Sequence, residues 1–151
     1  MKKLLVALVN TLLLAGCGSS GEREAEPRSL RSRTQKKEWN EPVFFQDAKL
    51  ESAVRTALEK PEGTITGKEV ASLVELVAED LGIRDLSGLE HATNLTKLYL
   101  TGNQVTDVRL LAKLTNLREL WLVGNEIADE QQAMLKTALP RCEIKFWFGE
   151  F

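Results

Sequence analysis

Two nearly identical stretches decide the fold: NLTKLYLTGNQVTD at residues 94–107 and NLRELWLVGNEIAD at residues 116–129. They begin 22 residues apart, and leucines, a glycine and asparagines stand at the same places in both. The same spacing extends along the chain and aligns three mostly apolar columns: Leu73, Leu95, Leu117 and Leu139; Leu76, Leu98, Leu120 and Cys142; and Ala78, Leu100, Leu122 and Ile144. A period kept over this length predicts a stack of structural repeats.

Each repeat contains an L-x-L core that alternates with a period of two, which predicts a short strand with its leucines on one side. Asn103 and Asn125 follow these strands. We expect them to be buried and to pair with backbone groups of the turn, which would otherwise be costly to bury. One repeat alone cannot offset the entropy of ordering its chain, so the repeats must share a continuous core.

The phrase L-x-x-L-x-L-x-x-N-x-[VI]-x-D resembles the 22-residue class of leucine-rich repeats found in internalin-like bacterial surface proteins. The resemblance covers roughly residues 44–148 and is most specific in the repeats that begin at Leu95 and Leu117; the one from Leu73 is weaker because Leu81 replaces the asparagine. It implies an α/β fold: a short right-handed βα solenoid with about three to four parallel strands, a helical N-terminal cap and a C-terminal helix-strand cap.

The expected organisation of the repeat domain follows from these columns. The domain should occupy residues 42–151, with an N-terminal cap at 44–72, repeats at 73–94, 95–116 and 117–138, and a terminal strand at 139–148.

Both caps have sequence patterns of their own. Asp47 is placed to cap a helix that carries an apolar stripe and stops before Pro61, and TGKE at residues 66–69 has capping-box spacing. At the other end, residues 129–139 predict a helix. The strand after it should point Cys142, Ile144, Phe146 and Phe148 inward, which makes Cys142 a core residue.

The N-terminus predicts export and a lipid anchor. Residues 1–16 have a basic start and an apolar run too short to span a bilayer, as in a signal peptide. Leu14-Ala15-Gly16-Cys17 resembles the lipobox of bacterial lipoproteins, which implies a diacylglyceryl group on the Cys17 thiol, cleavage before Cys17 and acylation (palmitate) of its amino group. The alternative is cleavage near Gly16 without lipid.

Residues 17–41 then form a charged tether, with almost nothing to bury. Its basic residues could attract anionic headgroups or could belong to a soluble spacer: Arg28, Arg31, Arg33, Lys36 and Lys37. We expect a membrane-anchored protein outside the cytoplasm. By analogy with lipoprotein sorting, the absence of Asp after Cys17 implies the outer membrane in a diderm, whereas a monoderm would keep the protein on its cell membrane.

The sequence offers little for catalysis. His91 is the single histidine, and no phosphate loop or Cys/His cluster with metal-ligand spacing occurs. Asp85, Asp107 and Asp129 recur at the repeat period, which suggests turn or helix capping more than a row of metal ligands. The net charge of −2 gives no basic field for nucleic acid. We expect no enzyme, no small-molecule substrate, no metal and no cofactor besides the lipid.

The residues between the inward leucines should form the concave face of the sheet. One row across it should contain Val77, Tyr99, Trp121 and Glu143, and Glu75 and Glu79 should also point outward. We predict that an unidentified protein partner binds a monomer at Lys97, Tyr99, Thr101, Glu119, Trp121, Val123, Glu143 and Lys145. The alternative is that Tyr99 and Trp121 only pack across strands, in a structural envelope lipoprotein without a dedicated ligand.

Overall fold

The computed structural model describes residues 40–147 and Gly149. The predicted signal peptide, Cys17, the basic stretch of the tether and Phe148 lie outside the described residues. In the described part, no helix is both long and apolar enough to cross a membrane.

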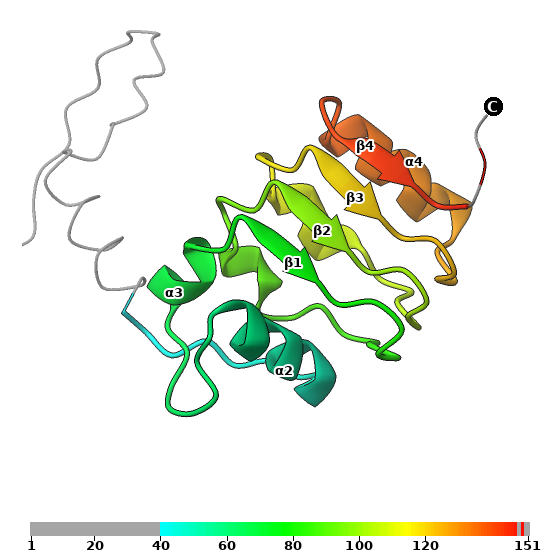
Figure 1. The fold of residues 1–151 in the computed structure, drawn as a ribbon. Coiled ribbons are helices and arrows are strands. Elements are labelled where there is room, and N and C mark those ends of the chain that lie inside the picture. Colours follow the sequence, from blue (N-terminus) through cyan, green and yellow to red (C-terminus); the bar gives the residue numbers. More distant parts are fainter. Residues whose placement is uncertain (1–39, 148, 150–151) are drawn as a thin grey trace, which may run out of the picture.

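Four short parallel strands form one sheet, and they stand in chain order (Figure 1). They are β1 (Glu75–Val77), β2 (Lys97–Tyr99), β3 (Glu119–Trp121) and β4 (Glu143–Lys145). Each strand places one leucine or isoleucine inward, where Leu76, Leu98 and Leu120 are fully buried. The predicted leucine-rich-repeat fold with parallel strands is confirmed.

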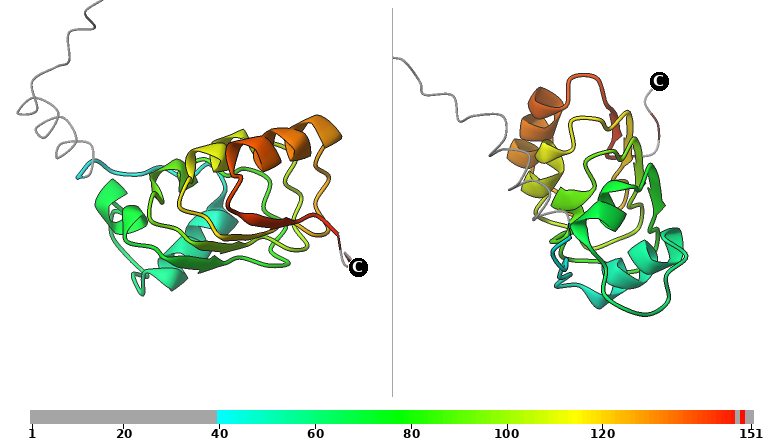
Figure 2. Two further views of the ribbon diagram at one scale, coloured as in Figure 1. Left: turned by 90° about the horizontal axis from the view of Figure 1, so that it is seen from above. Right: turned by 90° about the vertical axis from the view of Figure 1, so that its left-hand side faces the viewer.

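The connections return along the other side of the core and form a second layer (Figure 2). They contain the 3₁₀ helices η1 (Leu89–His91) and η2 (Arg109–Lys113) and the α-helix α4 (Asp129–Ala138). The helix predicted at residues 129–139 is therefore present. Leu89, Leu111 and Leu135, one from each connection, are fully buried against the strand leucines.

The register changes at the last strand. Glu75, Lys97 and Glu119 pair at the expected spacing of 22, but Glu119 then pairs with Glu143, which is 24 residues further on. The prediction that Glu143 stands beside Trp121 is wrong, because α4 and the segment after it make this connection two residues longer than the others. Lys145 stands beside Trp121 instead.

This change also moves Cys142 out of the leucine column. Ile144 occupies the place beside Leu120 that the 22-residue spacing assigns to Cys142. Cys142 is half-buried against the edge of the core rather than within it. Burial raises the pKa of its thiol to about 11, so the thiolate is disfavoured.

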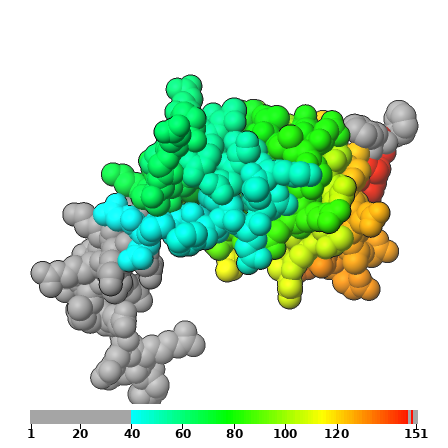
Figure 3. Space-filling view, turned by 90° about the horizontal axis from the view of Figure 1, so that it is seen from below, coloured from blue at the N-terminus to red at the C-terminus, as the bar shows by residue number. Residues whose placement is uncertain are grey.

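The N-terminal cap is built by α2 (Ala48–Ala57) and α3 (Gly67–Ala71), which lie at the β1 end of the sheet. The side chain of Asp47 accepts a hydrogen bond from the backbone N–H of Lys49, and Thr66 forms a capping box with Glu69. The predicted helix-capping roles of Asp47 and Thr66 are both confirmed. Figure 3 shows the described chain passing in sequence order from this cap to the last repeat.

The asparagines after the strands bond to the backbone of two successive repeats. Asn103 is only 4% exposed, and its Oδ1 accepts hydrogen bonds from the N–H groups of Leu81 and Ile83. Its Nδ2 donates to the carbonyls of Ala78 and Leu100, at 2.7 and 2.8 Å. The predicted role is therefore confirmed for Asn103. Asn125 makes the equivalent bonds to Val105, Leu100 and Leu122 but is half-buried rather than buried. In the first repeat, Leu81 stands in place of the asparagine and is exposed.

The three periodic aspartates have two different roles. Asp85 and Asp107 accept hydrogen bonds from the backbone N–H groups of Ser87 and Arg109, as predicted for turn capping. The capping prediction is wrong for Asp129, which is the first residue of α4 rather than its cap. Its carboxylate lies in the first turn, where a negative charge favours the helix dipole.

Candidate functional site

The concave face is the outward side of the four strands, and its centre is a pair of aromatic rings. Tyr99 on β2 and Trp121 on β3 are register partners. Their ring centroids lie 6.1 Å apart with an interplanar angle of 37°. Both side chains are half-buried rather than fully covered, so the structure brings together the two aromatic residues of the predicted surface and leaves part of each accessible.

A polar network lies beside the aromatic pair. Glu119 accepts a hydrogen bond from the Tyr99 hydroxyl at 3.2 Å and pairs with the ammonium of Lys97 at 3.3 Å. The bond to Glu119 raises the pKa of Lys97. Burial, followed by the bond to Glu119, raises the pKa of the Tyr99 phenol. Both groups are therefore held in their protonated, donating forms.

Strand β4 closes one side of this surface. The ammonium of Lys145 lies 4.7 Å from the centroid of the Trp121 ring and 3.1 Å from a carboxylate oxygen of Glu143. This is a cation–π contact with a carboxylate counter-ion, and the changed register of β4 makes it possible.

Two predicted members of the concave face differ from expectation. Val123 is only 4% exposed, so the prediction that it is available on the surface is wrong. It lies after the end of β3, and its carbonyl accepts the N–H of Gly102. Thr101 is half-buried, and its hydroxyl has no hydrogen-bond partner among the described residues.

A hollow of about 360 Å³ opens on the other side of the aromatic pair, toward β1. It is lined by Glu75, Val77, Glu79, Tyr99 and Trp121. Val77 is 57% exposed although it is apolar. The sequence placed Glu75, Val77 and Glu79 on the outward side, but the predicted binding set omitted them. The 22-residue spacing places Val77 beside Tyr99, with Glu75 and Glu79 on the same face of the strand. This signal could have added all three residues to the predicted binding set.

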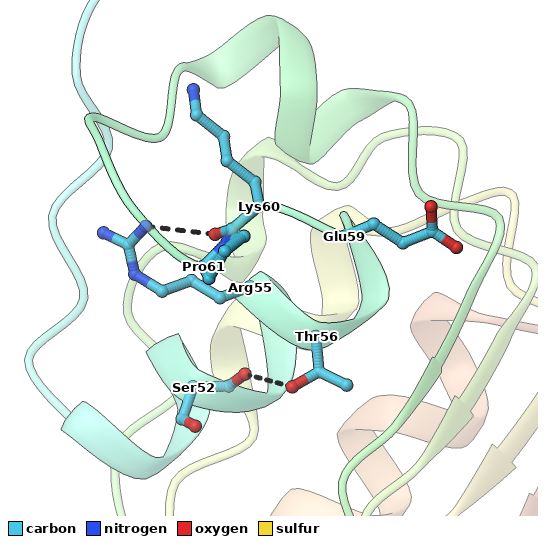
Figure 4. A pocket seen from close by; sticks show the side chains of 6 residues that line it. All are labelled: Ser52, Arg55, Thr56, Glu59, Lys60 and Pro61. Carbon is cyan, nitrogen blue, oxygen red and sulfur yellow. Dashed lines mark hydrogen bonds between the residues drawn. The ribbon is translucent and has the colours of Figure 1, made fainter.

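A second hollow lies in the N-terminal cap, and the bonds of its Arg55 side chain stabilise the cap. Figure 4 shows Arg55 of α2 directed at the loop that follows this helix. Its guanidinium donates to the carbonyls of Lys60 and Gly63 and to the carboxylate of Glu51. Because these bonds occupy the guanidinium and tie the loop to the helix, Arg55 stabilises the cap rather than offering a free cation to a ligand.

No arrangement for catalysis emerges from the described residues. His91 is exposed at the end of η1. Within residues 40–147, no group of three or more His, Cys, Asp or Glu side chains could hold a metal ion. The concave face itself presents aromatic rings, carboxylates and ammonium groups.

Comparison with known proteins agrees with the repeat architecture. Residues 93–132 match the family model of leucine-rich repeats in two copies. The fold is similar to that of an internalin of Listeria monocytogenes, at 29% identity and a TM-score of 0.64, over 71% of this chain and 32% of that one. It is also similar to the functional domain of InlJ from Listeria monocytogenes, which includes a cysteine ladder, at 31% identity and a TM-score of 0.57.

The InlJ match covers 66% of this chain and 21% of that domain. This chain thus spans about a third or less of the length of these two proteins. The chain therefore has a leucine-rich-repeat fold, with repeats similar to those of internalins.

Proposed function

We propose that this chain is a non-enzymatic cell-envelope lipoprotein that binds a protein partner through its concave face. Internalin-like repeat domains typically mediate protein–protein interaction and typically lack enzymatic activity. The fold alone does not fix the function, so the proposal depends on the site. The observation that carries it is the accessible pair of Tyr99 and Trp121 at the centre of a rigid sheet.

The aromatic pair has the properties of a binding centre. Tyrosine and tryptophan are enriched among the residues that contribute most to interface energies. Strand pairing and the bond from Tyr99 to Glu119 hold the rings in place, so a partner would lose little entropy in ordering them. Lys97, Glu119 and Lys145 surround the rings with polar groups, as expected at the rim of an interface.

The envelope location is supported by the sequence of the N-terminus. Residues 1–16 have the features of a signal peptide, and the Leu14-Ala15-Gly16-Cys17 stretch supports a lipid on Cys17. In this proposal residues 17–41 act as a tether that holds a monomeric repeat domain away from the membrane. Mass spectrometry of the N-terminal peptide tests the anchor: a diacylglyceryl group on Cys17 is expected, and an unmodified Cys17 would contradict the lipoprotein assignment.

Site-directed photo-crosslinking in intact cells tests the binding function. A photoreactive residue in place of Glu143 would stand on the exposed rim of the concave face, and one in place of Lys113 would stand on the opposite layer. We expect a discrete adduct from position 143 and none from position 113. Adding Tyr99→Ala and Trp121→Ala should remove the adduct from position 143.

The competing function is a structural envelope lipoprotein without a dedicated ligand. Cross-strand packing of Tyr99 on Trp121 favours this function, because each ring already covers part of the apolar surface of the other. An adduct that persists in the double alanine variant, while thermal melting shows that this variant is folded, would contradict binding through the concave face. No adduct from either position would favour the structural role.

A further inference from the structure

The two sides of the aromatic pair differ in one respect. On the β4 side, the row of Tyr99 and Trp121 continues with Lys145, whose ammonium covers the Trp121 ring. On the β1 side, the same row continues with Val77. The neighbouring row ends in a glutamate on both sides, Glu143 and Glu75. The chain thus places the cation of Lys145 beside Glu143, whereas Glu75 has the exposed apolar side chain of Val77 on its strand.

The β1 side has unpaired negative charge. Within residues 40–147, Glu75 and Glu79 accept no hydrogen bond and form no ion pair, although both line the hollow next to Tyr99. The cation nearest in register, Lys97, is paired with Glu119. No basic side chain of the described residues lines this hollow. The hollow therefore has a negative rim whose carboxylates form no ion pair among residues 40–147.

The shape of the hollow complements a long cationic side chain. Lysine and arginine join an apolar stem to a charged head and bury the stem while the head reaches polar groups. Val77 offers the stem an apolar floor, and the Tyr99 ring lines the same hollow, where a cation can contact it. Glu75 and Glu79 stand two residues before and two residues after Val77, and they offer carboxylates to the head.

We propose that the hollow bounded by Glu75, Val77, Glu79, Tyr99 and Trp121 binds an arginine or lysine side chain presented by the protein partner. The contact between Lys145, Trp121 and Glu143 is the intramolecular version of the same recognition. The inference rests on the proposed binding function and adds the chemistry of the partner. Arginine fits better than lysine, because its planar head can stack on Tyr99 while bonding two carboxylate oxygens.

The test uses the full chain in a non-ionic detergent and an acetylated, amidated Gly-Gly-Arg-Gly-Gly peptide. Its matched control is the same peptide with citrulline, which keeps the shape of arginine without the charge. We expect the arginine peptide to shift the NMR signals of Tyr99 and the Trp121 indole in a saturable way, and the citrulline peptide to bind at least about fivefold more weakly. Equal binding of both peptides, or no saturable shift, would overturn the proposal.

Two pairs of variants locate the effect. Glu75→Gln with Glu79→Gln should weaken binding of the arginine peptide about tenfold, whereas Glu126→Gln with Glu130→Gln removes the same charge elsewhere and should change it less than about twofold. Val77→Lys should place a cation of the chain itself in the hollow, as Lys145 does beside Trp121, and abolish binding of the arginine peptide. Val77→Leu keeps the apolar floor and should preserve this binding. Equal losses within either pair would contradict a site at this hollow.

The basic residues of the tether are the other possible occupant. Replacing Arg28, Arg31, Arg33, Lys36 and Lys37 by glutamine should leave the Tyr99 and Trp121 signals of the peptide-free chain unchanged. If these signals move instead, the tether fills the hollow, and the assignment to a partner is overturned.

The cellular crosslinking experiment separates this inference from the proposed function. Loss of the position 143 adduct in the Tyr99→Ala, Trp121→Ala variant, together with its persistence in the Glu75→Gln, Glu79→Gln and Val77→Lys variants, would keep the binding function and overturn the cation site. Loss in all three variants would support both. Persistence in the double alanine variant would overturn the binding function itself.

Discussion

Asn103 joins the turns of two successive repeats. Its side chain makes five hydrogen bonds to backbone groups while it is almost fully buried. We expect Asn103→Ala to lower the free energy of unfolding by about 3 kcal/mol, because it leaves several buried backbone groups without partners. Urea denaturation measures this change. The exposed neighbour Gln104 is the control, and Gln104→Ala should cost less than about 0.5 kcal/mol.

Asn103→Asp provides a second variant of the same size. The Oδ1 bonds to the N–H groups of Leu81 and Ile83 can persist, but the three carbonyls that now accept from Nδ2 would face a carboxylate. A stability equal to that of the unsubstituted chain in both variants would contradict the structural role of this asparagine.

Alanine substitutions at two glycines with positive φ angles can distinguish the cost of backbone strain from the cost of steric overlap. Gly63 (φ 85°) and Gly88 (φ 100°) both disfavour a side chain. A Cβ on Gly63 would meet only Lys60, at 3.6 Å, whereas one on Gly88 would lie 2.6 Å from the ring of Phe45. We expect Gly63→Ala to cost about 1–2 kcal/mol and Gly88→Ala about 1–3 kcal/mol more, measured by urea denaturation. Equal costs would show that the Phe45 ring moves freely.

At the scale of elements, the capping box of α3 should make stability depend on pH. The bond to Lys60, followed by those to Thr66, lowers the pKa of Glu69 from its ordinary 4.5 to about 2. A folded pKa below the unfolded one means that the ionised carboxylate stabilises the fold. This contribution is complete above about pH 5 and is lost as the pH falls toward 2.

Glu69→Gln should therefore lower the free energy of unfolding at pH 7, by no more than about 1 kcal/mol because Glu69 is partly exposed. The difference from the unsubstituted chain should shrink as the pH approaches 2. Urea denaturation at several pH values measures it, with Glu62→Gln as an exposed control on the preceding loop. A difference that is constant with pH would contradict the assigned charge effect.

Most of the elements could be predicted from the sequence, because local patterns dictate them. The spacing of Leu98 and Leu120 predicts strands, and Asp47 and Thr66 stand where helix caps are required. The register of β4 could not be predicted by extending the period, since the connection through α4 has its own length. Strand pairing is settled by how that helix packs, which the repeat spacing does not encode.

The candidate site was predictable to a similar extent. Alternation along the strands places Tyr99 and Trp121 outward, and strand order makes them neighbours. The burial of Val123 and the contact of Lys145 with Trp121 both lie at the β4 end, where the repeat gives way to the C-terminal cap. The proposed role of the β1 end depends on an unfilled space between side chains, which a sequence pattern does not describe.

At the scale of the whole molecule, the repeats and both caps share one core, which runs from Val43 to Leu139. Unfolding should therefore be a single cooperative transition. Leu120→Ala, at a fully buried position in the middle of the stack, should cost about 2–5 kcal/mol and shift the transitions measured by far-ultraviolet circular dichroism and by tryptophan fluorescence equally. Transitions that separate would show that the cap and the repeats unfold independently.

The register of β4 has a consequence for the composition of the exposed surface. Side chains alternate along a strand, so pairing β4 two residues further along preserves its inward and outward positions, whereas a shift of one residue would invert them. With a spacing of 24 residues, Ile144 still points inward beside Leu120; with 23, Glu143 would take its place. The shift of two residues therefore keeps the core intact. It moves the row of outward residues by one place and gives Trp121 a lysine rather than a glutamate as its neighbour.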